Sequence, residues 1–398
     1  MKKPELMSPI KNWASLEACK DYADAVYFAA SSLSMRQRSN NIRLNELKKF
    51  VDKCHEYKIK AYLTVNCAIY NNDIKTAEKI IRKAKETKVD ALIVWDPAVI
   101  DLAKKYKIKF FISTQANVCN WMSANFYQKL GASRIVLARE MTLKQIKELK
   151  KKVKINIEVF VHGALCYSVS GRCLLSSYIY GKSANRGMCY QPCREKWTLT
   201  NKNGKQVTTS GKYFLSAKDI CMIEHVPQLI KLGIDSFKIE GRRRDTKYIE
   251  VVSRCYREAI DSFFNKTFTK EKIEKWKKEL SSVYNRGFST GFFFGVPGKE
   301  GITYDYSGNI SKTKKIRIGE VVHYWPKVNV ASIKLRDRGI KVGEKIIIEG
   351  TKTFIEQEVD SIQIDGKDIK EAKKGDNIGI KTRSMTRKGD NVFIMRNK

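Results

Sequence analysis

Long apolar runs are missing from this chain. No stretch of about 18 apolar residues, the length of a membrane-spanning helix, occurs without a charge, and "ALIVW" and "GFFFGV" are short. The first residues, "MKKPELMSPIKNWASLEACKDYA", lack the apolar core and small-residue cleavage site of a signal peptide. These absences lead us to expect a soluble, cytoplasmic protein without a membrane partner.

Histidine is also scarce. The chain has His55, His162, His225 and His323, and none belongs to the zinc-binding motif His-Glu-x-x-His, which argues against a zinc protease. "GFSTG", Gly287–Gly291, spells Gly-x-Ser-x-Gly, but a nucleophile elbow needs a strand before the serine and a helix after it. A Lys-rich helical segment precedes this stretch and "FFFG" follows it, so we interpret it as a Gly-rich turn.

Acidic residues are outnumbered by basic ones. The chain has 77 Lys and Arg against 42 Asp and Glu, which gives a net charge of +35 and a pI near 9.7. Such a surplus favours polyanionic partners through counterion release, and RNA is the leading candidate. The alternative is a generally Lys-rich surface, because many lysines lie on predicted helix faces such as "KEKIEKWKKEL".

Short β-branched runs alternate with helical segments through the first two thirds of the chain. The predicted strands are 5–9, 25–30, 61–66, 91–96, 110–115, 134–139, 157–163 and 236–242. Between them, segments such as "NDIKTAEKIIRKAKE" place apolar residues three and four positions apart, as an amphipathic helix requires. This alternation predicts an α/β fold with a parallel sheet. Eight strands in about 240 residues match a TIM-like (β/α)8 barrel, with an open doubly wound sheet as the alternative.

The pattern predicts three regions. Residues 1–245 form the barrel, interrupted by a Cys-rich insertion at 163–215, and residues 246–312 form a helical and Gly-rich connection. From 313 to 398, short β-branched runs separated by turn residues predict a small β-barrel. Within the insertion, "KWTLTNKNGKQVTTSGKYFLS" predicts a hairpin that turns at Asn-Lys-Asn-Gly.

Polar residues follow the predicted strands where a barrel assembles its active site. They are Asn66, Asp96, Gln115, Arg139, Glu140, His162, Glu240 and Arg242. Each one alone is equally well explained as a helix N-cap or loop anchor.

Five cysteines gather around the insertion: Cys166, Cys173, Cys189, Cys193 and Cys221. A reducing cytosol disfavours disulfides, and the absence of paired C-x2-C motifs weakens a zinc ribbon. Cysteines from separate loops are typical of iron–sulfur sites, so this interpretation ranks before zinc and before buried or redox-active thiols. The neighbouring glycines, Gly163, Gly171, Gly181 and Gly187, would let the backbone approach a bulky cluster.

The stretch from Glu158 to Ser176, "EVFVHGALCYSVSGRCLLS", resembles the signature of the collagenase-like peptidase family, peptidase family U32. Every constrained position matches Glu-x-Phe-x-x-Gly-small-aliphatic-Cys, four residues, Gly-x-Cys-x-aliphatic-Ser. The resemblance continues through "RGMCYQPCR", "SAKDIC", "SFKIEGR" and "NRGFSTGFFFG". The terminal β domain resembles the translation-factor-type barrel of some members, so that nearly the whole chain is covered.

This resemblance implies one of two activities. The family was named for collagen degradation, whereas several members hydroxylate tRNA wobble uridine, an rRNA cytidine or a ubiquinone precursor without oxygen. Those members carry a 4Fe-4S cluster on four cysteines, prephenate is implicated as the hydroxyl source for RNA, and some require a paralogous partner subunit. We expect hydroxylation of a tRNA or rRNA base. The alternatives are a peptidase and an RNA-binding scaffold with a structural cluster.

The resemblance also implies site residues. It makes Cys166 and Cys173 cluster ligands, with Cys189 and Cys221 as the preferred other pair and Cys193 as the alternative to Cys221. The catalytic candidates are Glu240, Arg242, His162 and Glu140. In "KIEGRRRDTK", the candidates for phosphate contacts are Arg242, Arg243, Arg244 and Lys247. A solvated helix start explains Arg243 and Arg244 equally well. For a cysteine peptidase, His162 is the one close partner of Cys166.

Overall fold

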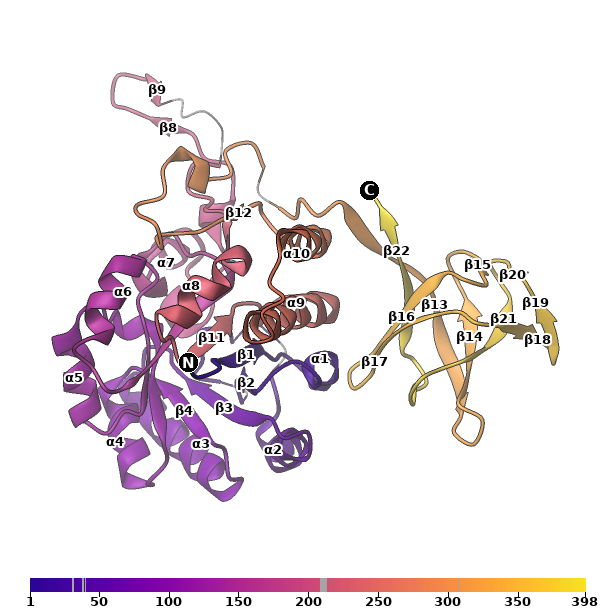
Figure 1. Cartoon of the computed structure of the whole chain (residues 1–398), viewed down its shortest axis with the longest axis horizontal. Coiled ribbons are helices and arrows are strands. Elements are labelled where there is room, and N and C mark those ends of the chain that lie inside the picture. Colours follow the sequence, from indigo (N-terminus) through magenta and orange to yellow (C-terminus); the bar gives the residue numbers. More distant parts are fainter. Residues whose placement is uncertain (31, 38, 40, 208–212, 307) are drawn as a thin grey trace.

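The computed structural model describes all residues except 31, 38, 40, 208–212 and 307. Its centre is a closed barrel of eight parallel strands (Figure 1). The strands are β1 (Glu5–Pro9), β2 (Ala25–Phe28), β3 (Lys60–Val65), β4 (Ala91–Val94), β5 (Phe110–Ile112), β6 (Arg134–Val136), β7 (Asn156–Ala164) and β11 (Ser236–Ile239). β11 pairs with both β1 and β7, which confirms the TIM-like barrel and excludes the open sheet.

Helices surround the barrel because their apolar residues recur on one face. In α3 (Ile74–Glu86), the buried residues are Ala77, Ile80, Ile81 and Ala84. The other barrel helices are α1 (Trp13–Cys19), α2 (Leu47–Glu56), α4 (Pro97–Lys105), α5 (Trp121–Lys129), α6 (Leu143–Lys150), α8 (Val226–Lys231) and α9 (Thr246–Phe264). α10 (Lys270–Ser282) packs on α9. No helix of the described residues is both long and apolar enough to cross a membrane.

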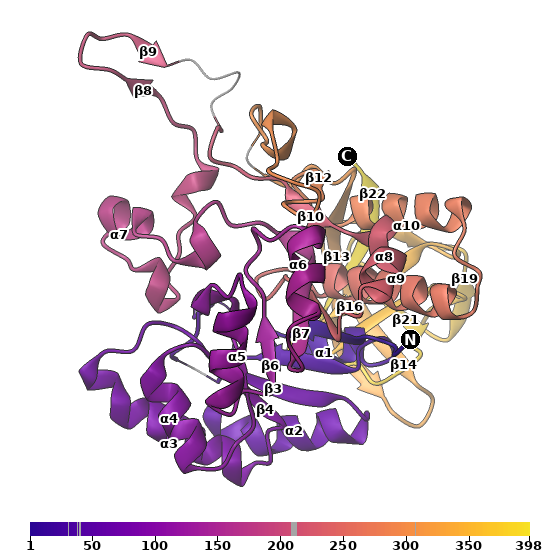
Figure 2. The ribbon, with the colours of Figure 1, turned by 60° about the vertical axis from the view of Figure 1, so that its left-hand side comes forward.

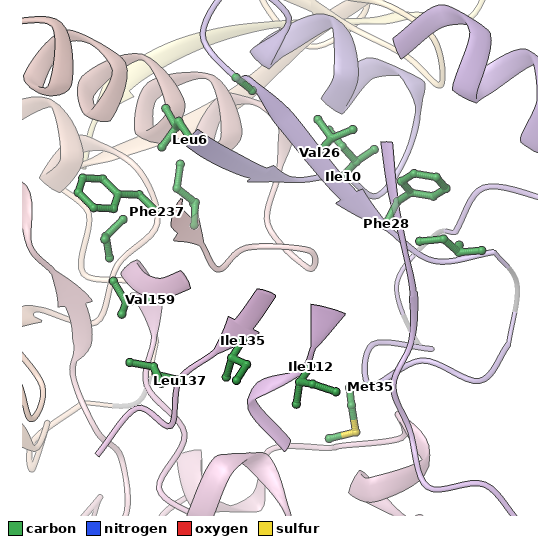
Figure 3. Close-up of a cluster of buried hydrophobic side chains, with 14 of the residues drawn as sticks. Leu6, Ile10, Val26, Phe28, Met35, Ile112, Ile135, Leu137, Val159 and Phe237 are labelled. Carbon is green, nitrogen blue, oxygen red and sulfur yellow. The ribbon is translucent and has the colours of Figure 1, made fainter. Parts of the chain in front are cut away.

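Alternate strand residues point to opposite faces of the barrel wall. Leu6, Val26 and Phe237 belong to the core between strands and helices (Figure 3). Met7 and Tyr27 belong to a separate cluster formed by the alternate residues of the same strands. This two-sided burial explains why the strands are nearly continuous apolar runs.

The insertion leaves the barrel after β7 and returns before β11. It contains the short helix α7 (Leu175–Tyr180) and a hairpin of β8 (Leu199–Thr200) and β9 (Gln206–Val207), which stand away from the barrel (Figure 2). The predicted hairpin is confirmed by the pairing of residues 199 and 200 with 207 and 206; its residues 208–212 lie outside the described part. β10 (Asp219–Cys221) then pairs antiparallel with β7.

The C-terminal region is an eight-stranded antiparallel sheet with the shape of a half-barrel, and it lies to one side of the barrel (Figure 1). Its strands are β13 (Thr313–Trp325), β14 (Val330–Leu335), β16 (Lys345–Glu349), β17 (Phe354–Glu358), β18 (Ile362–Ile364), β19 (Lys367–Ile369), β21 (Asn377–Lys381) and β22 (Asn391–Asn397). β15 (Ile340–Lys341) and β20 (Glu371–Ala372) form a separate pair. The sheet has its own apolar core, which includes Ile318 and Ile348.

Candidate functional site

Four of the five clustered cysteines line one cavity of about 120 Å³. They are Cys166, Cys173, Cys189 and Cys193, and all are half-buried. Their supports are turns of the insertion: the Cys166 sulfur lies 3.1 Å from the Ser168 hydroxyl, and the Cys173 sulfur accepts the Leu175 N–H at 3.4 Å. The structure therefore gathers thiols that are up to 27 positions apart in the sequence.

The four thiols are close enough to influence one another. The pKa of Cys193 is raised to about 11, first by burial and further by the charges of Cys166, Cys189 and Cys173. Within the part of the chain that the structure describes, however, no three His, Cys, Asp or Glu side chains are arranged to bind one metal ion. The thiols share a cavity without the close convergence that a single zinc ion requires.

The structure groups Cys193, rather than Cys221, with the other three cysteines. Cys221 is buried in β10 beside the Tyr256 hydroxyl, and burial raises its pKa to about 11. It does not line the cysteine cavity. The preference for Cys221 over Cys193 as a ligand stays a prediction, but the cavity groups Cys193 with the other three, because "KDIC" forms a strand paired with β7, whereas Cys193 lies in the 3-10 turn Pro192–Arg194 and lines the cavity.

Two glycines allow the insertion to pack closely against the barrel. Gly163 has φ +101° and Gly187 has φ +82°, so both adopt backbone conformations that side chains disfavour. A Cβ at Gly163 would collide with the Glu240 carbonyl, and one at Gly187 with the Ser34 carbonyl. These glycines were expected to give room to a cluster, but at these two positions they give room to the barrel backbone.

Below the cysteine cavity lies a second cavity of about 50 Å³ in the mouth of the barrel. The two cavities share Met35, Arg36, Gln115 and Arg139 as lining residues, so they are adjacent. Glu240 and Arg242, both predicted catalytic candidates, line the second cavity. The barrel mouth therefore opens toward the cysteines.

Three partly buried guanidinium groups act on one carboxylate in the barrel mouth. Arg36 donates to Glu240 at 3.3 Å. Burial would raise the pKa of Glu240, but Arg36, Arg244 and Arg139 together lower it, so the carboxylate is ionised. Arg139 and Arg242 also line the cavity. Positive charge is in excess here, which favours a small anion.

Arg242 and Arg139 are held in place by neighbouring polar groups. Arg242 donates to the hydroxyls of Ser34 at 2.9 Å and Thr64 at 3.2 Å. Arg139 donates to the Ala164 carbonyl at 2.9 Å and lies 4.0 Å from the centre of the Phe160 ring. Burial lowers the pKa of both side chains, that of Arg242 to about 10. Among the described residues, the buried Nε atoms of Arg139 and Arg242 have no hydrogen-bond partner, so each retains a donor.

The other two catalytic candidates lie outside both cavities. His162 is 1% exposed and packs among the rings of Tyr248, Tyr256 and Phe288. Burial lowers its pKa to about 3, so the imidazole is neutral. Glu140 is half-buried after β6 and lines neither cavity. Position after a strand does not by itself bring a residue into the site.

The predicted phosphate-binding residues are mostly engaged within the protein. Arg242 is 2% exposed, Arg244 stacks on the Tyr284 ring at 3.5 Å, and Lys247 pairs with Glu250 at 2.8 Å. Arg243 is exposed at the edge of the cysteine cavity. Of these four, Arg243 alone has the surface position that a phosphate contact requires.

Arg36 is the site residue that the sequence did not reveal. It lies in the loop that follows β2, among polar residues without a motif. Because barrel active sites lie at the carboxyl ends of the strands, this loop was a possible location. Arg36 itself could be identified only from the fold, which brings it to Glu240, 204 positions away in the sequence.

The serine of "GFSTG" is not in a nucleophile elbow. β12 (Phe288–Ser289) pairs with β10, and a turn follows it instead of a helix. The missing helix agrees with the rejection of the elbow, but the predicted turn begins only at Gly291, after the short strand.

Comparison with known proteins supports one family. The sequence model of Peptidase family U32 matches residues 11–303. A Methanocaldococcus jannaschii protein named an uncharacterized protease is 43% identical over 98% of both chains. A collagenase of Porphyromonas gingivalis is 34% identical over 98% of this chain and 97% of its own. The tRNA hydroxylation protein P1 of Bacillus subtilis is 32% identical over 84% of this chain and 81% of its own.

Proposed function

Because the chain belongs to peptidase family U32, we propose that it is an iron–sulfur enzyme that hydroxylates a base of tRNA or rRNA without molecular oxygen. The observation that carries this proposal is the single cavity lined by four cysteines above a cationic barrel mouth. The relatives named tRNA hydroxylation proteins support the reaction, and the net charge of +35 suits an RNA substrate.

The proposed cluster ligands are Cys166, Cys173, Cys189 and Cys193. Four thiols match the ligand number of a 4Fe-4S cluster. Their half-buried position would shield a cluster while leaving one side open to substrate. When bound, such a cluster supplies redox or Lewis-acid chemistry. The protein's own residues position the reactants around it.

In the barrel mouth, we assign Arg36, Arg139 and Arg242 to a small carboxylate. Prephenate, the hydroxyl source that the family resemblance implies, is our candidate. Its carboxylates would accept hydrogen bonds from the free Nε donors, while Glu240 holds Arg36 in position. The target base would enter from the cysteine side, which requires an unpaired or flipped nucleotide.

A peptidase is the second candidate, because two relatives are named protease and collagenase. A cysteine peptidase would need a histidine beside its thiolate. His162, the residue predicted for that role, is buried among aromatic rings and lines neither cavity. This geometry disfavours the peptidase.

Two measurements test the proposal. Protein purified without oxygen should contain iron and sulfide in equal amounts and give the EPR signal of a reduced 4Fe-4S cluster; stoichiometric zinc without iron would contradict it. Mass spectrometry of tRNA and rRNA nucleosides from a deletion strain should show the loss of one hydroxylated base. The deletion strain gives this answer whether or not a paralogous partner is required. Iron without a lost modification would favour the scaffold, and peptide cleavage abolished by Cys166→Ser in metal-free protein would favour the peptidase.

A further inference from the structure

The surface of the insertion around the cysteine cavity carries four tyrosines, which we call the tyrosine rim: Tyr167, Tyr178, Tyr180 and Tyr190. We propose that this rim stacks unpaired bases of a single-stranded RNA segment and so presents the target nucleotide to the cavity. The inference rests on the proposed RNA-directed function and adds the form of RNA that is recognised and the residues that hold it.

The exposure of these rings is unusual. Tyr178 is 83% exposed and Tyr167 is 56% exposed, whereas Tyr180 and Tyr190 are 36% and 38% exposed. Large aromatic side chains are normally buried for most of their surface. Several of them around a cavity mark an interaction surface rather than scattered surface residues.

The rim is joined directly to the cavity. Tyr167 follows Cys166 and lines the cavity itself, and Tyr190 follows Cys189. Tyr178 and Tyr180 lie on α7, which stands away from the barrel wall on the same side (Figure 2). A base stacked on these rings would therefore lie beside the entrance to the proposed site.

Part of the rim is held firmly. The rings of Tyr180 and Tyr190 lie 5.4 Å apart and are tilted by 36°. The Tyr180 hydroxyl donates to Glu195, and the backbone N–H of Tyr190 donates to the Ser176 hydroxyl at 3.0 Å. Rings fixed in this way lose little freedom when a ligand stacks on them.

The charge around the rim selects a polyanion. Residues 163–198 contain five basic side chains and one acidic one, Glu195, which the Tyr180 hydroxyl contacts. Of the basic side chains, Arg194 is buried and Arg186 pairs with Asp73. Arg172 and Lys182 are exposed on the same insertion. Aromatic platforms with interspersed cations are the usual means of binding single-stranded nucleic acid, because every base has a π face and every nucleotide a phosphate. Duplex RNA offers its backbone but not its base faces.

Fluorescence anisotropy under anaerobic conditions tests the rim, with a labelled single-stranded oligouridine of about 12 nucleotides as the probe. Tyr178→Ala should weaken binding by about fivefold to a hundredfold, the loss expected for one stacked base. Tyr178→Phe is the matched control, because it keeps the ring, and should bind like the wild type. The iron content should be the same in all three proteins, since Tyr178 does not line the cavity.

Salt dependence tests the charge separately. Lys182→Ala should reduce the slope of log affinity against log salt by about 0.7, the value for one phosphate contact on a single strand. Lys104→Ala removes an exposed lysine from α4, outside the insertion, and should leave the slope unchanged.

The outcomes separate the two proposals. If the wild type binds the oligonucleotide and Tyr178→Ala binds it equally well, the rim is overturned while the proposed function stands. Equal affinity for a duplex of the same length would also overturn the rim. If the wild type binds neither the oligonucleotide nor tRNA, the proposed RNA-directed function fails as well.

Discussion

The two adjacent cavities are built in different ways. In the barrel mouth, Arg242 is fixed by Ser34 and Thr64, and Arg36 is fixed by Glu240, all on strands or on loops that follow them. The cysteine cavity is built from turns, a helix of six residues and glycines with positive φ. The mouth is therefore preorganised by protein contacts, whereas the arrangement of the cysteines rests on fewer contacts and would depend much more on the proposed cluster.

The largest effect is expected from loss of a cluster ligand. Cys193→Ser should lose most of its iron and sulfide, and residues 163–198 should become sensitive to limited proteolysis while the barrel stays resistant. Cys221→Ser is the matched control, because Cys221 is buried outside the cavity beside Tyr256. Iron analysis and mass mapping of the fragments check both. If Cys221→Ser loses iron and Cys193→Ser does not, the ligands are Cys166, Cys173, Cys189 and Cys221, as preferred from the sequence.

The junction between barrel and insertion should show the next largest effect. Gly163→Ala places a Cβ against the Glu240 carbonyl at φ +101°, so it should lower the free energy of unfolding by about 3 kcal/mol. Gly181 also has positive φ, +61°, but its Cβ would meet nothing within 4 Å; Gly181→Ala should cost about 1 kcal/mol. Denaturant titrations compare them. Equal losses would show that the insertion is as tightly packed as the junction.

The pH dependence of stability tests His162, the residue that precedes Gly163 at the same junction. The pKa of His162 is about 3 in the folded protein, below its usual 6.5, so between these values the unfolded chain binds the additional proton. Stability from this residue is complete above pH 6.5 and falls as the pH decreases, by about 2 kcal/mol between pH 6.5 and 5.

Denaturation midpoints of wild type and His162→Phe over this range measure the difference. The variant should lose the part of the slope that comes from His162, whereas His225→Gln, at a more exposed histidine, should keep it. Parallel slopes for wild type and His162→Phe would mean that His162 binds its proton equally well in the folded and the unfolded protein.

The barrel was predictable because the same sequence pattern, an apolar run followed by an amphipathic segment, recurs along the chain. Eight apolar runs such as 61–66 and 91–96 alternate with amphipathic segments, and each is confirmed as a strand followed by its connection. The grouping of Cys193, rather than Cys221, with the other three cysteines was not predictable, because it depends on whether a short segment forms a turn or pairs with β7. His162 shows the same limit: in the sequence it ends a strand, and only packing against Tyr248 and Tyr256 shows that it faces away from the site.

Among the predictions, the smallest effect is expected in the preorganised mouth. Arg36→Gln removes the donor to Glu240 and one of the three guanidinium groups that line the mouth, so the affinity for prephenate, measured by calorimetry, should fall about tenfold. Arg36→Lys keeps the charge but lacks the planar guanidinium group, so its affinity for prephenate should lie between those of the wild type and Arg36→Gln. The iron content of both variants should equal that of the wild type, because Arg139 and Arg242 keep their own partners and the cysteines are untouched. Unchanged prephenate affinity in Arg36→Gln would place the anion outside the mouth, whereas a simultaneous loss of iron would show that the two cavities form one cooperative unit.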